Sequence, residues 1–467
     1  MAVAQSPSAV PGRQPWLTPE LAAIVATAIL GLVLRAHELT QAPLITDNAD
    51  ELQFTWAGLN MITRGDAYTW SYYPAYPSTT PFRAFGNTYP LVHHWLDHPP
   101  LFSLVMGGWA WLLGDRGMLD VTADQIRVLP VLFSTVTIVL VYWLGRDLLG
   151  RLPALAGALL LATAPGAVLL GRQAEPESLQ AVLLLASLIA TLHLLRTRAA
   201  PPSRWLVAGL VAVALLSPLL KVTGVAIGGV CGVALAIGGR WRLGLALVLA
   251  AAAGVGLFAL YGWAVDWTVF VKAWKVQTSN RVSVQSAYDF ITWSSGANRR
   301  LEDGWWILGW IGVGAWLLAR RGPRELLLAW PVVAYAATIL VMAGERQAEQ
   351  YGWYKVILYP EVYLAAGYLV WLAVAAPSLS RLGMVLVLGG ATATNWWLGA
   401  GGKAWAPNPI YLTLILLAVL VPAAVAAWRP GIRSLLLARA VAVAAFALML
   451  LGNATESLHL SELLFKL

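Results

Sequence analysis

The sequence predicts an all-α integral membrane protein. Of its 467 residues, 59% are hydrophobic and only 12% are charged, whereas soluble domains average about 45–50% apolar and about 25% charged residues. Its mean hydropathy is +0.68. About thirteen windows of roughly 17–25 apolar residues are each able to cross about 30 Å of hydrocarbon. These windows are 17-36, 126-145, 153-171, 178-195, 205-220, 222-239, 243-265, 304-319, 325-343, 353-375, 382-399, 409-427 and 434-452.

Short arginine clusters lie between alternate windows and predict the orientation of the chain. By the positive-inside rule these clusters are cytoplasmic, as is the tail that carries Arg13. We therefore expect the C-terminus outside, in a bacterial-type plasma membrane. The net charge of +8 reflects these clusters, so we do not expect nucleic acid as a partner. The first window continues without a small-residue cleavage signature, which predicts a retained helix.

The acidic residues give an independent check of this predicted topology, since they contribute little to the orientation of membrane helices. Of the 23 Asp and Glu residues, only Glu20, Asp147 and Glu325 fall on the predicted inner side. The chemistry is therefore expected outside. The single cysteine, Cys231, excludes an intramolecular disulfide and a paired-thiol metal site. We predict one polytopic domain, divided into a tail and first span (1-36), an outer loop with interfacial helices (37-125), spans two to seven (126-265), a second outer loop (266-303) and spans eight to thirteen with a tail (304-467).

The apolar segment 100-114 is treated as an interfacial helix. Runs of about 10–14 apolar residues are more often interfacial or re-entrant than spanning. Counting it as a span would also move every later arginine cluster to the outer face.

Three acids, Asp47, Asp50 and Glu51, follow the first window closely. They fit a solvated loop end. A carboxylate in a partly desolvated groove also has a raised pKa and can accept a proton from a hydroxyl as general base. The same oxygens suit a divalent cation, and proximity along the chain does not separate the two roles.

The stretch HHWLDHPPL (93-101) is the second candidate. On a helix, His94 and His98 with Asp97 would gather three metal ligands. Pro99 and Pro100 favour a different arrangement, in which the histidines precede the helix, because prolines suit a first turn and not a helix interior.

The predicted loop GRQAEPESLQ (171-180) carries Arg172, Glu175 and Glu177. The two glutamates fit the N-terminus of the next helix, whose dipole attracts anions. Arg172 is a candidate partner for phosphate.

Two further cations lie at or within apolar stretches. Lys221 interrupts LLSPLLKVTGVAIG, where an ionisable side chain faces a cavity or partner or snorkels to the surface. Tyr354 and Lys355 begin the tenth window, where an aromatic belt explains the rings and Lys355 suits a lipid phosphate.

The second outer loop adds five cations and three tryptophans. A basic and aromatic lid opposite the acids of the first loop would suit an anionic substrate with a sugar-like ring. These residues are Lys272, Lys275, Arg281, Arg299, Arg300, Trp267, Trp274 and Trp293.

The order of five motifs along the chain resembles that of the GT-C fold glycosyltransferases. These motifs are DNADE, the HPPL helix, QIRVLPVLFSTVTIVLVYWLGRDLLG, GRQAEPESL and the Lys-Val-Thr-Gly stretch. More narrowly, they resemble the protein O-mannosyltransferase and lipid A aminoarabinose transferase superfamily. The likeness covers about the first 240 residues, and later only YGWYKVILYP resembles a family pattern.

The resemblance implies roles for particular residues. The Asp of the family's Asp-Glu pair matches Asp50 and implies the catalytic base, with Glu51 following. The family's Lys-Pro-Pro-Leu is His98-Pro99-Pro100-Leu101 here, so a protonated His98 would replace a phosphate-contacting lysine. Glu177 matches an acid that lines the active cavity.

The implied reaction moves a sugar from a polyprenyl-phosphate donor to a hydroxyl of a protein, lipid or glycan on the extracytoplasmic side, with inversion. Arg172, Lys355 and residues 299–300 would neutralise the leaving phosphate. No cofactor is implied as essential, and a divalent cation stays an option. The alternatives are a membrane transporter or lipid flippase, against which few acids and no paired broken helices are predicted within the spans, and an inactive GT-C scaffold.

Overall fold

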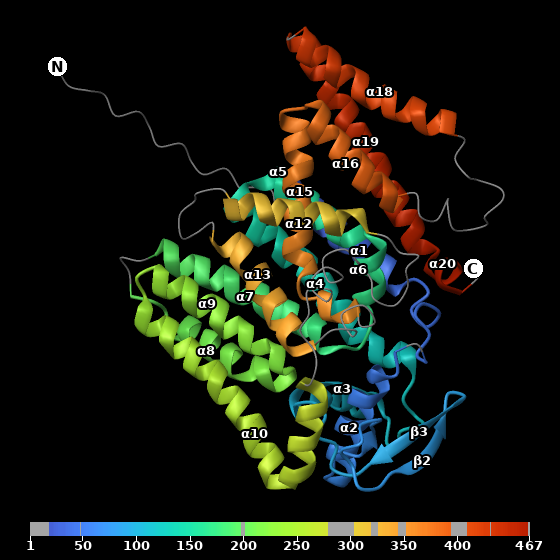
Figure 1. The fold of residues 1–467 in the computed structure, drawn as a ribbon, viewed down its shortest axis with the longest axis vertical. Helices are drawn as coiled ribbons and strands as arrows, with labels where there is room; N and C mark the ends of the chain where they lie inside the picture. Colours follow the sequence, from blue (N-terminus) through green and yellow to red (C-terminus); the bar gives the residue numbers. More distant parts are fainter. Residues whose placement is uncertain are drawn as a thin grey trace.

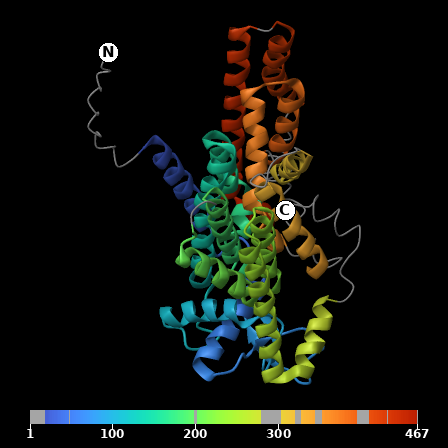
Figure 2. The same cartoon turned by 90° about the vertical axis from the view of Figure 1, so that its left-hand side faces the viewer.

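The computed structural model describes residues 18–46, 48–197, 201–278, 303–318, 326–343, 352–393, 409–429 and 431–465. It consists of an elongated helical bundle and a smaller part, formed mainly by the first predicted loop, at one end of that bundle (Figures 1 and 2).

Five of the described helices are long and apolar enough to cross a membrane. They are α1 (Pro19–Ala36), α4 (Ala123–Leu149), α7 (Pro176–Arg196), α10 (Trp241–Thr278) and α19 (Ile432–Leu458).

Shorter helices complete the bundle. They are α5 (Arg151–Thr163), α6 (Pro165–Leu170), α8 (Arg204–Leu220), η1 (Val222–Gly224), α9 (Val225–Ile237), α12 (Gly304–Leu318), α13 (Leu326–Ala343), η2 (Gly352–Lys355), α15 (Tyr359–Ala375), α16 (Leu379–Ala393), α18 (Pro409–Trp428) and α20 (Leu460–Phe465). Each of the thirteen predicted windows contains a helix. The number of helices that cross the membrane stays a prediction.

The predicted second outer loop begins at residue 266, and the structure has a turn at this position. Helix α10 continues to Thr278, and only Asp266 within it has non-helical backbone angles. The Asp266 carboxylate accepts a 3.0 Å hydrogen bond from the Val269 amide, the contact by which an aspartate caps a new helix. The chain therefore turns at Asp266 and resumes as a helix.

The first predicted loop contains two helices, as expected, and also a small sheet. The helices are α2 (Asp50–Arg64) and α3 (Pro100–Leu113). The strands β1 (Thr69–Trp70), β2 (Thr80–Ala84) and β3 (Asn87–Val92) form an antiparallel sheet of order β1-β3-β2. The expectation of an all-α protein is therefore wrong in this loop. Phe85 and Gly86, both with positive φ, form the two-residue turn that the twist of a hairpin favours.

Helices α2 and α3 cross in direct backbone contact. A Cβ added to Gly58 would lie 1.7 Å from the Ser103 carbonyl oxygen, and one added to Gly107 would lie 2.1 Å from the Leu59 nitrogen. Only glycine permits this approach. In Figure 2, α3 lies roughly across the long axis of the bundle, which suits the predicted interfacial orientation.

Candidate active site

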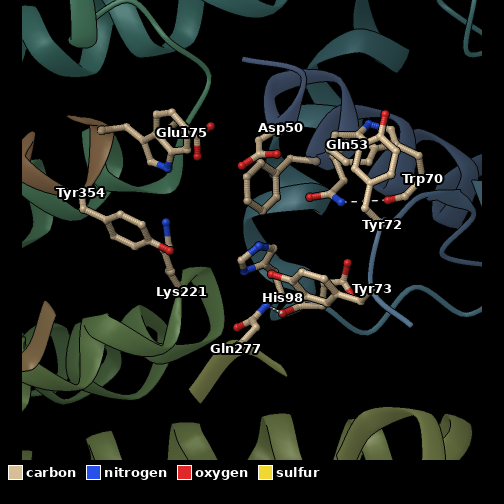
Figure 3. A pocket seen from close by; sticks show the side chains of 13 residues that line it. Asp50, Gln53, Trp70, Tyr72, Tyr73, His98, Glu175, Lys221, Gln277 and Tyr354 are labelled. Carbon is tan, nitrogen blue, oxygen red and sulfur yellow. Dashed lines mark hydrogen bonds between the residues drawn. The ribbon is translucent and has the colours of Figure 1, made fainter. Parts of the chain in front are cut away.

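A cavity of about 180 Å³ lies where the small part meets the bundle. Its lining comes from α2, the segments around the sheet and before α3, the start of α7, the break after α8, the end of α10, and η2 (Figure 3). The lining residues are Asp50, Gln53, Phe54, Trp70, Tyr72, Tyr73, Asp97, His98, Glu175, Lys221, Gln277, Trp353 and Tyr354.

Asp50 is the first residue of α2, and its half-buried carboxyl group points into the cavity (Figure 3). Its amide donates a 3.3 Å hydrogen bond to the Asn48 side-chain oxygen. The pKa of Asp50 is raised to about 6, mainly by burial. The positive charge of Lys221 lowers this pKa, and the negative charge of Glu177 raises it further. The group is therefore mainly ionised at neutral pH and close to the range in which a carboxylate exchanges protons efficiently.

Glu175 faces Asp50 across the cavity from the residue before α7 (Figure 3). Its Oε1 accepts a 2.8 Å hydrogen bond from the Asn48 amide, and Oε2 has no partner among the described residues. Burial, followed by the charge of Asp50, raises the pKa of Glu175 well above its usual range. The Glu175 carboxyl group therefore keeps its proton to a higher pH than an exposed glutamate does.

Lys221 lies at the break between α8 and η1, in extended backbone. Its Nζ donates a 2.5 Å hydrogen bond to Glu177 Oε1 and lies 3.8 Å from the centroid of the Tyr354 ring. Lys221 and Tyr354 line the cavity, whereas Glu177 does not. The sequence left two interpretations of Lys221 open. The geometry matches the first, in which the side chain faces a cavity and a partner, and not the second, in which it snorkels to the surface.

Asp97 and His98, in the segment before α3, also line the cavity. Tyr76 donates a 2.7 Å hydrogen bond to Asp97 Oδ1, and burial raises the pKa of Asp97 to about 6. The His98 ring lies 5.1 Å from the Phe54 ring. His98 thus lines the same cavity as Asp50.

The arrangement that would pair His94 with His98 on a helix is absent, as Pro99 and Pro100 lead one to expect. His94 contacts Asp66 at 2.9 Å, whereas His98 lies in the cavity. Both precede α3, as the two prolines indicate. Among the residues that the structure describes, no group of three or more His, Cys, Asp or Glu side chains is suited to hold a metal ion.

Glu51 does not line the cavity, in contrast to the expectation. It is fully buried in an ion pair with Arg127 of α4, with distances of 2.5 and 2.9 Å. Arg127 also donates to the carbonyls of Leu39 and Pro43, and Glu51 accepts from the Ala174 amide. The pair joins three chain segments and fixes the start of α2.

Arg172 does not reach the cavity either. Its buried guanidinium donates to backbone carbonyls just after α1, at His37 (2.8 Å) and Ala42 (3.1 Å), and to Leu34 (3.2 Å) within it. The side chain therefore holds the end of α1. Arg172 is therefore not among the residues that line the cavity.

Lys355 is buried as well, with its Nζ 5.6 Å from the centroid of the Trp306 ring. It is not among the cavity residues, whereas its neighbours Trp353 and Tyr354 are. The predicted residues Asp47, Arg281, Trp293, Arg299 and Arg300 lie outside the described residues.

Several cavity residues were not predicted as site residues. Gln53 donates a 2.8 Å hydrogen bond to the Trp70 carbonyl, and Trp70, Tyr72 and Tyr73 form one aromatic side of the cavity (Figure 3). Gln277 donates to the Asp97 carbonyl. The many aromatic residues between positions 68 and 76 could have indicated this side of the cavity. The sequence analysis did not predict the small sheet beside them.

Similarity in fold defines the class of this protein. The structure of ArnT from Cupriavidus metallidurans bound to undecaprenyl phosphate matches with a TM-score of 0.52 and 18% identity, over 93% of this chain and 77% of that chain. The apo structure of the same protein gives 0.51 and 17%, with the same coverage. AglB from Archaeoglobus fulgidus gives 0.48 and 12%, over 91% of this chain and 56% of that chain. The chain is an integral membrane protein with the GT-C fold, as its motifs predicted.

Within this class, residues 97–263 match the family described as dolichyl-phosphate-mannose-protein mannosyltransferase. This match covers part of the chain and agrees with the resemblance seen in the sequence. No curated protein matches the sequence significantly.

Proposed function

We propose that the chain transfers one sugar from a polyprenyl-phosphate donor to an acceptor hydroxyl on the extracytoplasmic side, with Asp50 as general base. The observation that carries the proposal is the position of Asp50, half-buried at a cavity that also contains the cation of Lys221. The donor is supported by the structural similarity to ArnT, which was solved with undecaprenyl phosphate.

Asp50 would take the acceptor's proton while the acceptor oxygen attacks the anomeric carbon. The new carbon–oxygen bond forms as the bond between the sugar and the phosphate oxygen breaks, and attack from the opposite face inverts the anomeric configuration. A pKa of about 6 supports this role, because Asp50 is ionised at neutral pH yet basic enough to accept a proton.

Among the described residues, Lys221 and His98 are the basic side chains that line the cavity. We assign the leaving phosphate to them, in place of Arg172 and Lys355, because charge on the phosphate grows as the bond breaks. The Tyr354 ring beside Lys221 leaves the ammonium group partly dehydrated, which strengthens its interaction with an anion.

The aromatic residues Trp70, Tyr72 and Tyr73 are assigned to the sugar. Aromatic faces with a few polar groups suit a pyranose ring, which has apolar faces and polar edges. Gln53 and Asp97 supply hydrogen-bonding groups beside them.

The test compares purified wild type with Asp50→Asn on a panel of polyprenyl-phosphate sugars, with and without a chelator. Release of polyprenyl phosphate is measured alongside incorporation into peptide, lipid and glycan acceptors. We expect turnover of at least one donor and a loss of about 10²-fold or more in Asp50→Asn. Asp66→Asn is the matched control, because Asp66 belongs to the same loop but does not line the cavity.

Absence of turnover with every donor, or equal turnover by Asp50→Asn, would contradict the proposal. The same preparations in vesicles test the transporter and flippase alternative by measuring movement of labelled donor. An inactive scaffold would bind donor without releasing its phosphate.

A further inference from the structure

A second and larger cavity, of about 460 Å³, lies among the ends of α1, α4 and α5. Helix α4 connects the two regions of the molecule, since its first residues contact α3 through the 2.8 Å hydrogen bond from Trp109 to the Gln125 carbonyl. Its last turn reaches the second cavity through Arg146. From Ala123 to Arg146 the helix rises by roughly 35 Å, about the thickness of the hydrocarbon layer. The second cavity therefore lies at the membrane surface opposite the candidate active site.

Two arginines share one carboxylate at this cavity. Arg146 and Arg151 both form ion pairs with Glu20, and the Arg151 contact is 3.0 Å. Glu20 also accepts a 2.8 Å hydrogen bond from Tyr142. Asp147, the nearest other acid on α4, is neutralised by Arg196. The cavity therefore retains one positive charge.

The guanidinium groups keep capacity for another anion. Both ion pairs use the Nε atom of the arginine, and no hydrogen bond among the described residues uses their terminal nitrogens. The Arg151 side chain is 69% exposed. A phosphate oxygen can thus approach the outer side of both groups while Glu20 holds their inner side in place.

The rim of the cavity has the composition of a membrane interface. The Trp143 ring lies under the Arg146 guanidinium, 5.1 Å from it, and tryptophan is enriched at headgroup depth. Leu21 and Leu152 are exposed beside the charged residues. An anion that binds here would therefore have apolar side chains next to it, where acyl chains can lie.

We propose that this cavity binds the phosphate headgroup of an anionic phospholipid in the leaflet opposite the active site. Basic pockets between transmembrane helices suit such headgroups. A soluble phosphate ester presents the same oxygens, but it would not use the exposed leucines.

The experiment titrates phosphatidylglycerol, phosphatidylcholine or sn-glycerol 3-phosphate into the delipidated full chain and measures bound adducts by native mass spectrometry. We expect preferential binding of phosphatidylglycerol. The variant Arg146→Gln/Arg151→Gln should weaken it by about tenfold or more. The matched control is Arg204→Gln/Arg429→Gln, since these exposed arginines also lie over tryptophan rings, at 5.4 and 5.0 Å, but not at this cavity. It should bind as wild type does.

Two further variants protect the test against misfolding. Arg151→Gln removes an exposed side chain and should weaken binding alone. Glu20→Gln frees both guanidinium groups and should tighten binding, whereas a purely structural cluster would be weakened by the same change. Unchanged binding in the double variant, weaker binding in Glu20→Gln, or equal binding of sn-glycerol 3-phosphate would overturn the proposal. Sugar transfer is measured separately, so failure here leaves the proposed function intact.

Discussion

Asp50 and Glu51 are adjacent residues with opposite environments. Successive residues on an α-helix point about 100° apart, so one carboxylate faces the cavity while the other turns toward Arg127. The first is available for proton transfer, and the second is held in a structural ion pair.

The pH dependence of sugar transfer should report Asp50. Because burial raises its pKa to about 6, the base is lost as pH falls through that value. We expect kcat/KM to fall about tenfold per pH unit below pH 6. A pH profile of kcat/KM between pH 4.5 and 8 measures this, and a profile that stays flat down to pH 4.5 would exclude Asp50 as the titrating base.

Asp50→Asn should increase stability at neutral pH while it abolishes activity. A raised folded pKa means that the folded state binds more protons than the unfolded state between pH 3.8 and about 6, so the aspartate lowers stability progressively across that window and fully above it. Thermal unfolding in detergent should show a higher Tm for Asp50→Asn at pH 7.5 and a smaller gain at pH 5. A lower Tm at pH 7.5 would contradict this.

Lys221 and Glu177 should behave as a coupled pair. Lys221→Met leaves the Glu177 carboxylate buried without its partner, which costs about 3–5 kcal/mol. Lys221→Met/Glu177→Gln should recover much of that stability without recovering activity, because the cation is still missing from the cavity. Thermal unfolding and donor turnover of the three proteins separate the two effects. Recovery of turnover in the double variant would remove Lys221 from the proposed mechanism.

At the level of elements, the crossing of α2 and α3 positions the site, because α2 carries Asp50 and the segment before α3 carries His98. Gly107→Ala inserts a methyl group 2.1 Å from the Leu59 nitrogen and should destabilise the protein by about 1–3 kcal/mol. Gly108→Ala is the control on the same helix, since its nearest neighbour is Ile62 Cδ1 at 3.8 Å. Thermal unfolding should show a loss only for Gly107→Ala, and similar losses in both would argue against the close crossing.

The helices within the thirteen windows could be predicted because each window is a long apolar run, and hydrocarbon leaves few alternatives to a helix for such a segment. The sheet could not be predicted in the same way, because its strands are only two to six residues long and lie between residues typical of turns. The seventh apolar window ends at residue 265, next to the break at Asp266, but it gives no sign that the helix resumes and continues to Thr278.

At the level of the whole molecule, two buried arginines connect the first loop to the bundle. Arg127 holds Glu51 and two carbonyls of the chain after α1, and Arg172 holds the end of α1 itself. Arg127 is 76 residues from Glu51 in sequence, so no local pattern reveals the contact.

Arg127→Met should loosen this connection, because it leaves the Glu51 carboxylate buried and unpaired, at a cost of about 3–5 kcal/mol. We expect faster hydrogen exchange in residues 37-64, with the bundle helices α8 and α9 little changed. Arg116→Gln, an exposed arginine at the end of α3, is the control. Uniformly faster exchange across the chain would indicate global destabilisation instead.

Composition and the spacing of the apolar runs alone determine that this is a membrane protein and where its helices lie. A segment that crosses hydrocarbon must be apolar and must satisfy its backbone hydrogen bonds within a helix. The ordered motifs indicate the glycosyltransferase class and select the acidic segment after the first helix. Only the tertiary structure decides which of those charges are exposed to substrate. Arg172, Glu51 and Lys355 are buried among other parts of the protein, whereas Asp50, His98 and Lys221 meet at one cavity. Whether a charged side chain is buried or lines the cavity depends on contacts between residues far apart in sequence, because the partners that stabilise these buried charges lie on other segments of the chain.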